Sequence, residues 1–268
     1  MKQRVISTLL LWAIVILLPL TLGLPGATIL VAVFGLLSMI ELRDLLNRSG
    51  FSLSAIWAPL GGMALLAIAA IYPTQPEWLL AGFFSLLVAG TCCVLLTGTV
   101  ERFPQQAAAW LLFLCLIPLP FAIAAQMLVM PGIWVFVWIL AVAKFTDVGA
   151  LLTGLMIGKH KMAPRLSPKK TWEGLAGGLV TAVLISALFI TLFDEYLPSW
   201  LNLVNGLWMA VPVAIAGVLS DLLESALKRA AKVKDSGNRI PGIGGILDLT
   251  DSLILSLPVA YILFLIVI

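Results

Sequence analysis

Acidic and basic residues are concentrated in one stretch near the C-terminus, residues 221–251. The chain of 268 residues is 62% hydrophobic and 11% charged, yet this stretch holds five acids and five bases. Charged side chains are costly near a bilayer and are usually kept there for chemistry or transport. Carboxylates that can hold a divalent metal, beside bases that can neutralise phosphate, are the groups that phosphoryl or nucleotidyl transfer needs.

The acids of this stretch stand at spacings that could bring them together. Asp221, Glu224 and Lys228 are three and four residues apart, so they share one face if the preceding apolar run continues as a helix. A surface ion pair between Glu224 and Lys228 is the alternative, but it leaves Asp221 without a role. Asp248 and Asp251 lie at the entry to the last apolar run, where either could instead cap a helix. We predict that Asp221, Asp248 and Asp251 hold Mg²⁺ or another divalent cation, because all three offer hard oxygen ligands.

A glycine-rich turn separates these two groups of acids. Residues 234–245 read KDSGNRIPGIGG. Glycines allow backbone N–H groups to approach a phosphate closely and to adopt positive φ. The turn is not a Walker A loop, and it is not a Rossmann turn because no strand–turn–helix unit surrounds it. We expect Gly244 and Gly245 to bind substrate, and Lys234 and Asp235 to belong to the catalytic group.

A second charged group occupies residues 158–174, which read GKHKMAPRLSPKKTWEG. Its candidate substrate-binding residues are Ser167, Lys169, Lys170 and Glu173. Asp147 lies in the preceding apolar run, three residues after Lys144, and could bind substrate or simply be neutralised by that base. His160 is the only histidine, so we expect a bystander there and exclude a histidine-based metal site.

Membrane spans must position these groups. A mean hydropathy of +1.12 excludes a soluble globule, and continuous apolar runs of about 18 residues or more fit helices rather than a barrel. The predicted fold class is an all-α polytopic integral membrane protein. About nine transmembrane helices are expected, near residues 5–22, 25–40, 54–72, 78–97, 107–128, 132–157, 174–193, 203–222 and 252–268. The sixth run could carry a break near residues 147–149.

The distribution of bases predicts the orientation. With nine spans, fifteen of the sixteen Lys and Arg residues fall on one side of the membrane, and Lys144, inside a span, is the exception. By the positive-inside rule the N-terminus is cytoplasmic. The expected location is the cytoplasmic (inner) membrane, with the active site facing the cytoplasm. We expect residues 1–130 to form a multi-span membrane region, and residues 131–268 to form the catalytic membrane region with cytoplasmic-face loops 158–174 and 221–251.

At the residues quoted above, the sequence resembles the phosphatidate cytidylyltransferase (CDP-diacylglycerol synthase) family. The family signature runs roughly S-x-L-K-R-x4-K-D-x-G-x3-P-G-H-G-G-x-L-D-R-x-D. The residues that match it in register are Ser225, Leu227, Lys228, Arg229, Lys234, Asp235, Gly237, Pro241, Gly242, Gly244, Gly245, Leu247, Asp248 and Asp251. The family's central loop is similar to residues 158–174, and its intramembrane aspartate would be Asp147. Two positions depart from the signature, since Ile243 replaces its His and Leu249 its second Arg. The N-terminal half is similar only as a hydrophobic multi-span region.

The resemblance implies transfer of a cytidylyl group from CTP to phosphatidate, giving CDP-diacylglycerol and pyrophosphate. The catalytic group would be Asp221, Lys228, Arg229, Lys234, Asp235, Asp248 and Asp251. Substrate binding would fall to Asp147, Ser167, Lys169, Lys170, Glu173, Glu224, Arg239, Gly244 and Gly245. Expected partners are CTP, phosphatidate or a similar anionic lipid, and the membrane, with no nucleic acid; a homodimer would suit a lateral opening for lipid.

The two departures leave alternatives open. One is a related CTP-dependent transferase that acts on another lipid phosphate or a polyprenol. Another is an inactive lipid-binding paralogue. A transporter is disfavoured, because the acids cluster at one membrane face and no internal repeat is visible.

Overall fold

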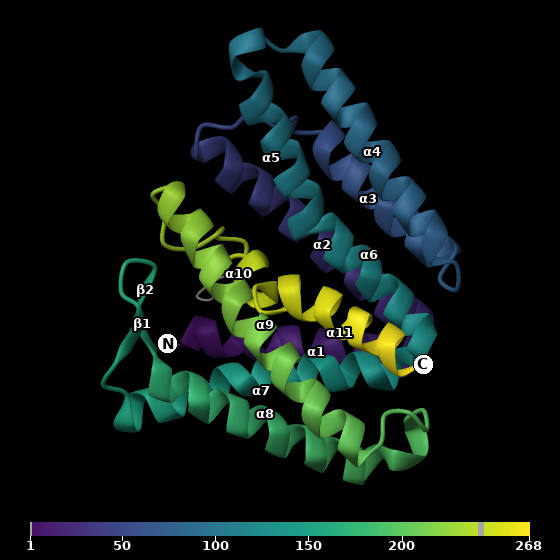
Figure 1. Ribbon diagram of the computed structural model, residues 1–268, viewed down its shortest axis with the longest axis vertical. Coiled ribbons are helices and arrows are strands. Elements are labelled where there is room, and N and C mark those ends of the chain that lie inside the picture. The colour runs from purple at the N-terminus through teal and green to yellow at the C-terminus, as the bar shows by residue number, and fades with distance from the viewer. Residues whose placement is uncertain (1, 241–243) are drawn as a thin grey trace. The chain divides into compact units, whose positions relative to one another are not determined.

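The structure is a computed structural model that describes residues 2–240 and 244–268. Helices make up most of it (Figure 1). Pro241, Gly242 and Ile243, which include two signature matches and one departure, lie outside the described residues. The chain divides into two compact units: unit 1 holds residues 1–130 and 227–250, and unit 2 holds residues 131–226 and 251–268.

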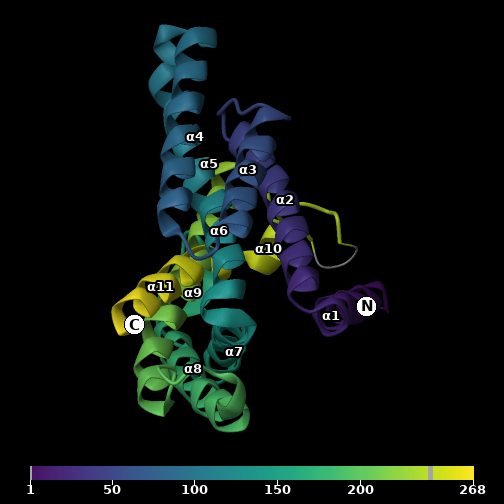
Figure 2. The same cartoon turned by 90° about the vertical axis from the view of Figure 1, so that its right-hand side faces the viewer.

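Unit 1 contains the N-terminal helices. These are α1 (Lys2–Leu22), α2 (Leu24–Arg48), α3 (Trp57–Ile71), α4 (Pro76–Thr97), a 3₁₀ turn η1 (Val100–Arg102), α5 (Phe103–Leu116) and α6 (Pro118–Met127). The pairs α3–α6 and α4–α5 pack together (Figure 2). Apolar side chains such as Met39, Leu65 and Phe113 are fully buried between these helices. The short helix α10 (Leu247–Thr250), from the C-terminal stretch, packs against α2.

Proline and glycine interrupt the apolar runs of unit 1, as their backbone chemistry requires. Gly23 has φ 61° and ends α1, and Pro25 then occupies the first turn of α2. Pro118 separates α5 from α6, so the predicted fifth span consists of two helices. A π-helical turn, η2 (Leu128–Gly132), follows α6.

Unit 2 is built on a helical hairpin of α7 (Ile133–Ile157) and α8 (Trp172–Phe193), which ends in a 3₁₀ turn η3 (Asp194–Tyr196). Glycines let the two backbones approach closely. A Cβ on Gly149 would lie 2.1 Å from Thr181 Oγ1, and a Cβ on Gly177 would lie 2.0 Å from Thr153 Oγ1. The predicted break near residues 147–149 is therefore wrong, because glycine serves helix packing there and α7 continues through it.

Two further helices complete unit 2. Residues 203–226 of α9 (Leu203–Ala230) and the last helix, α11 (Leu253–Val267), belong to it. A polar seam joins α9 to α11: Ser256 Oγ donates to the Val213 carbonyl at 3.1 Å, and Leu255 N donates to Ser220 Oγ at 3.2 Å. The final four residues of α9, 227–230, fall in unit 1.

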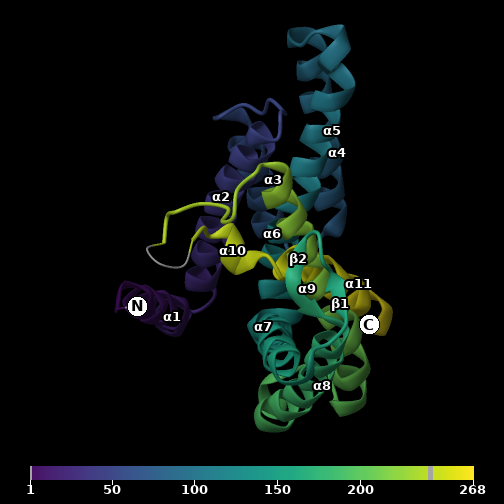
Figure 3. The same cartoon turned by 90° about the vertical axis from the view of Figure 1, so that its left-hand side faces the viewer.

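A small β-hairpin, which was not predicted from the sequence, connects α7 to α8 (Figure 3). Strands β1 (Lys161–Ala163) and β2 (Ser167–Thr171) pair antiparallel, with Lys161 opposite Thr171 and Ala163 opposite Ser167. Thr171 then caps α8, since its Oγ1 accepts a hydrogen bond from Gly174 N at 3.1 Å.

Five helical segments among the described residues are long and apolar enough to cross a membrane: 76–97, 100–157, 172–196, 203–230 and 247–267. Segment 100–157 has 58 residues and covers two of the predicted spans. Helix α3 has 15 residues and is too short to be counted among these membrane-spanning segments. The chain is therefore an all-α integral membrane protein, while the number of nine spans stays a prediction.

Candidate functional site

Helix α9 carries the acidic residues at the start of the C-terminal stretch. The predicted continuation past residue 220 is correct, because α9 runs to Ala230. It ends where Lys232 adopts φ 56° and Val233 N donates to the Lys228 carbonyl at 2.9 Å, a helix-ending geometry that glycine more often provides. The chain then leaves the helix axis and enters the glycine-rich turn.

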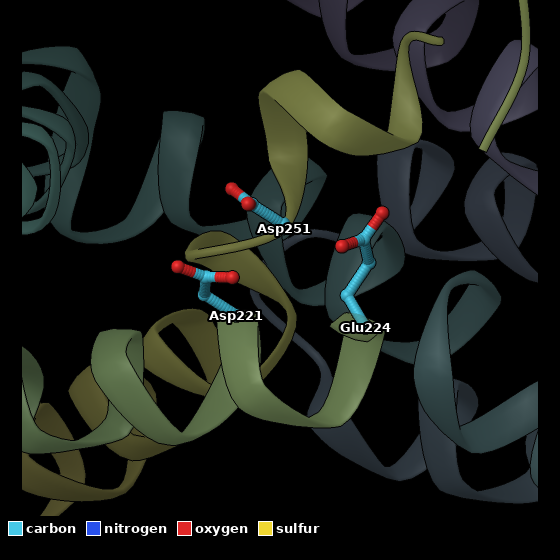
Figure 4. Close-up of side chains that lie close together, drawn as sticks. All are labelled: Asp221, Glu224 and Asp251. Carbon is cyan, nitrogen blue, oxygen red and sulfur yellow. The ribbon is translucent and has the colours of Figure 1, made fainter. Parts of the chain in front are cut away.

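Three carboxylates of unit 2 form a cluster, which we call the carboxylate cluster: Asp221 and Glu224 from α9, and Asp251 from the turn before α11 (Figure 4). One oxygen of each lies within 4.8 Å of the others, and Glu224 is fully buried. The predicted metal ligands Asp221 and Asp251 are thus neighbours, and the structure adds Glu224, which was predicted to bind substrate.

Two lysines bring positive charge to the carboxylate cluster. Lys170 Nζ lies 2.8 Å from Asp221 Oδ2 and donates to the Val218 carbonyl at 3.3 Å. Lys144 Nζ lies 3.5 Å from Asp251 Oδ1. Asp147, one helical turn after Lys144, interacts electrostatically with both lysines. Lys144 therefore does not neutralise Asp147 alone, as the sequence suggested, because it also contacts Asp251.

The backbone before α11 fixes the position of Asp251. Ser220, fully buried, donates a short hydrogen bond from Oγ to the Asp251 carbonyl. The Asp251 carboxylate in turn accepts a hydrogen bond from Ser252 N at 2.6 Å. Ser220 stands beside Asp221 at the end of an apolar run, and this was the available signal for a contact that was not predicted from the sequence.

Strand β2 of the hairpin places two predicted lysines, Lys169 and Lys170, in different environments. Side chains alternate along a strand, so Lys170 is half-buried and reaches Asp221 while its neighbour Lys169 is exposed. Ser167 is half-buried on the same strand. Glu173 closes the base of the hairpin, accepting hydrogen bonds from Lys159 N and His160 N at 3.1 and 3.2 Å.

A second group of predicted residues lies in unit 1, around Asp248 on α10. Lys228 Nζ lies 2.8 Å from Asp248 Oδ1, and both side chains are about 15% exposed. Asp248 Oδ2 accepts hydrogen bonds from Gly245 N at 2.8 Å and from Ser236 N at 3.0 Å. Asp248 therefore organises the glycine-rich turn, and its predicted role as a metal ligand stays a prediction.

The glycine-rich turn has the positive φ that its composition predicts. Gly244 has φ 126°, and its backbone pairs with that of Ile240 through two hydrogen bonds of 3.0 and 3.1 Å. A Cβ on Gly244 would lie 2.7 Å from Asp248 Oδ2, so glycine is required for both conformation and space. Lys234, Asp235 and Arg229 are exposed around the turn.

The structure adds residues that the sequence analysis did not consider. Glu41 on α2 and Ser236 in the turn are both buried and bonded to each other. Arg239, predicted to bind substrate, also contacts Glu41, at 3.3 Å. An acid inside an apolar run was the available signal for Glu41, because such residues are functional candidates by default.

Comparison with known proteins covers the whole chain. Residues 2–267 match the model of the cytidylyltransferase family. Similar proteins include a phosphatidate cytidylyltransferase of Staphylococcus haemolyticus, 33% identical over 98% of each chain, and one of Staphylococcus aureus strain COL, 30% identical over 98% of each. A phosphatidate cytidylyltransferase of Haemophilus influenzae is 39% identical over 47% of this chain and 44% of its own. The chain therefore belongs to the cytidylyltransferase family.

Proposed function

We propose that the protein transfers the cytidylyl group of CTP to phosphatidate, forming CDP-diacylglycerol and releasing pyrophosphate. The observation that carries this proposal is the carboxylate cluster, in which Lys170 pairs with Asp221 and Lys144 with Asp251, in a chain of the cytidylyltransferase family. In this reaction a phosphate oxygen of the lipid attacks the α-phosphorus of CTP. The bond from that phosphorus to the β-phosphate bridging oxygen breaks, and pyrophosphate leaves with its electron pair.

A divalent cation fits the carboxylate cluster. All three groups are carboxylates, the ligands that Mg²⁺ prefers. One oxygen each of Asp221, Glu224 and Asp251 already lies within 4.8 Å of the others, so these residues would hold the cation. Asp248 is proposed as a further metal ligand. When bound, the cation would neutralise phosphate charge that develops during transfer.

The bases are proposed to hold phosphate oxygens. Phosphoryl-group transfer depends mostly on positioning and on neutralising charge. We assign this role to Lys228, Arg229, Lys234 and Arg239, with Asp235 in the same catalytic group. The proposed contacts to nucleotide or lipid headgroup come from Asp147, Ser167, Lys169, Lys170, Glu173, Gly244 and Gly245. No external base is needed, since the attacking lipid phosphate is already anionic at neutral pH.

The proposed setting is the cytoplasmic membrane, with about nine spans and a cytoplasmic N-terminus. The bias of fifteen bases to one side supports it. Residues 131–268 would then be the catalytic region, with its loops at the cytoplasmic face, where CTP is present. Lipid would enter laterally between helices, and a homodimer is the proposed assembly; the mass of the detergent-solubilised particle tests that assembly.

Release of pyrophosphate tests the function. Purified protein in mixed micelles is given CTP with and without phosphatidate, and with and without Mg²⁺. The proposal expects release that needs both additions and that falls strongly in Asp248→Asn. Folded protein that releases no pyrophosphate would refute the proposal, and release with another lipid phosphate or a polyprenol acceptor instead would reassign the substrate.

A further inference from the structure

A buried carboxylate from the N-terminal half binds the glycine-rich turn of unit 1. Glu41 on α2 is 2% exposed and accepts hydrogen bonds from groups 195 to 206 residues later in the chain. Ser236 Oγ donates to its Oε2 at 3.1 Å, Leu247 N donates to the same oxygen at 2.9 Å, and Arg239 Nη1 donates to Oε1 at 3.3 Å. A carboxylate is kept buried only where such partners offset its lost hydration.

Two glycines of the turn make room for this carboxylate. A Cβ on Gly237 would lie 2.6 Å from Glu41 Oε1, and a Cβ on Gly245 would lie 2.3 Å from Glu41 Oε2. At Gly245 the same Cβ would also lie 2.1 Å from Ser236 Oγ and 2.8 Å from Gly237 N, so a larger residue there would disturb both Ser236 and Glu41. At Gly237 a larger residue would displace the Glu41 carboxylate.

Ser236 connects Glu41 to Asp248. Its hydroxyl oxygen lies 3.1 Å from Glu41 Oε2 and 2.9 Å from Asp248 Oδ2, and its backbone N–H also bonds to Asp248. Gly245, in contact with Glu41, donates its own N–H to Asp248 at 2.8 Å. The Asp248 carboxylate thus bonds to Ser236, which Glu41 holds, and to Gly245, which leaves room for Glu41.

Helix α2 also holds the two flanks of the turn. The Leu37 carbonyl accepts a hydrogen bond from Arg239 Nη1 at 3.1 Å. Ser38 Oγ lies 3.1 Å from Thr250 Oγ1 at the end of α10, and both side chains are buried. Leu37, Ser38 and Glu41 of α2 therefore hold residues on both sides of the turn, at Ser236 and Arg239 and at Leu247 and Thr250.

We propose that Glu41 is a positioning residue for nucleotidyl transfer, acting through Ser236 on Asp248 and its partner Lys228. The inference rests on the proposed function and extends it, because it gives part of the N-terminal half a role in the active site. Partners that orient a functional carboxylate typically change metal affinity or activity by about 10- to 100-fold when they are removed.

The test compares Glu41→Gln with Glu101→Gln, the same chemical change at an exposed glutamate of unit 1. Glutamine keeps the shape of residue 41 but offers one acceptor oxygen and places an NH₂ group among donors. We expect kcat to fall about 10- to 100-fold in Glu41→Gln, with KM for CTP changed less than about threefold, and no change in the control.

Hydrogen exchange without substrate supplies a second measurement, which does not depend on activity. Amides of Ser236, Gly245 and Leu247 should exchange about tenfold faster in Glu41→Gln. Leu247 loses its carboxylate acceptor, and Asp248, the acceptor for Ser236 and Gly245, loses the support of Glu41 through Ser236. Amides of the α7–α8 hairpin should not change. A wild-type protein that releases no pyrophosphate would overturn the proposed function alone, while faster exchange in the variant would still support the anchoring of the turn.

A purely structural role predicts a different result. The inference is overturned if the folded fraction of Glu41→Gln keeps wild-type kcat, or if exchange of the turn is unchanged. If Glu41→Gln fails to fold, Ser236→Ala tests the inference instead, because it removes only the hydroxyl that bridges Glu41 and Asp248. It must then lower kcat at least about tenfold in folded protein, and a wild-type value would refute the inference.

Discussion

Replacing Lys170 by Met should separate the proposed phosphate-binding role of this residue from any role in folding. Methionine keeps the length of an unbranched side chain and removes the ammonium. In the structure that ammonium lies 2.8 Å from Asp221 Oδ2, and the two side chains are 21% and 28% exposed. The change therefore removes positive charge beside the carboxylate cluster while leaving the packing of β2 nearly intact.

The structure sets the size of the expected effect. A hydrogen bond to a charged group contributes about 1.5–3 kcal/mol net, and partial exposure of both groups favours the lower half of that range. We expect the ammonium to bond phosphate oxygens at a comparable free energy when CTP binds. Since about 1.4 kcal/mol corresponds to a factor of ten, kcat/KM for CTP should fall about 10- to 40-fold.

The Mg²⁺ requirement provides a sign that a folding defect would not produce. Loss of a positive charge next to three carboxylates should strengthen cation binding, so half-maximal activity should need less Mg²⁺ in Lys170→Met. Lys161→Met, an exposed lysine on β1, is the matched control and should stay within about twofold of wild type. The reasoning fails if Lys170→Met keeps wild-type kcat/KM, or if its Mg²⁺ requirement rises.

Three further predictions concern the cluster, the turn and the topology. Asp221→Asn should raise the Mg²⁺ concentration for half-maximal pyrophosphate release by about tenfold or more; an unchanged requirement would exclude Asp221 as a ligand. Gly244→Ala should lower the free energy of unfolding by about 1–3 kcal/mol in denaturant titrations. It should cost more than Gly50→Ala, because Gly50 also has positive φ but has no atom within 4 Å of its Cβ position. In a variant without the three native cysteines, a cysteine at Arg48 should react with an impermeant reagent only from the cytoplasmic side and one at Glu195 only from the far side; the reverse pattern would overturn the orientation.

Local patterns in the sequence predicted the helices and part of the carboxylate cluster. The apolar runs specify helices because a chain in lipid must satisfy its backbone internally. Spacing of three along α9 brought Asp221 and Glu224 together, and the entry to the last helix supplied Asp251. The different orientations of Lys169 and Lys170 needed knowledge of a strand, which so short and charged a segment did not reveal.

Contacts between distant segments could not be predicted from one sequence. Glu41 looked like an isolated acid in an apolar run, and its role depends on a turn almost 200 residues later. Residues 227–250 group with residues 1–130 in one unit, although they adjoin the other unit in the chain. Gly149 suggested a helix break, but it allows close contact between α7 and α8. Local sequence preferences do not reveal such a contact between two helices.

The most direct test of the central claim follows the phosphorus atoms of CTP. CTP labelled at the α-phosphorus, or separately at the γ-phosphorus, is incubated with the purified protein, phosphatidate and Mg²⁺, and the lipid is extracted. The account predicts that the α-label enters the lipid fraction as CDP-diacylglycerol, while the γ-label stays in the aqueous phase as pyrophosphate. Transfer of the γ-label to lipid, or of neither label by folded protein, would contradict cytidylyl transfer.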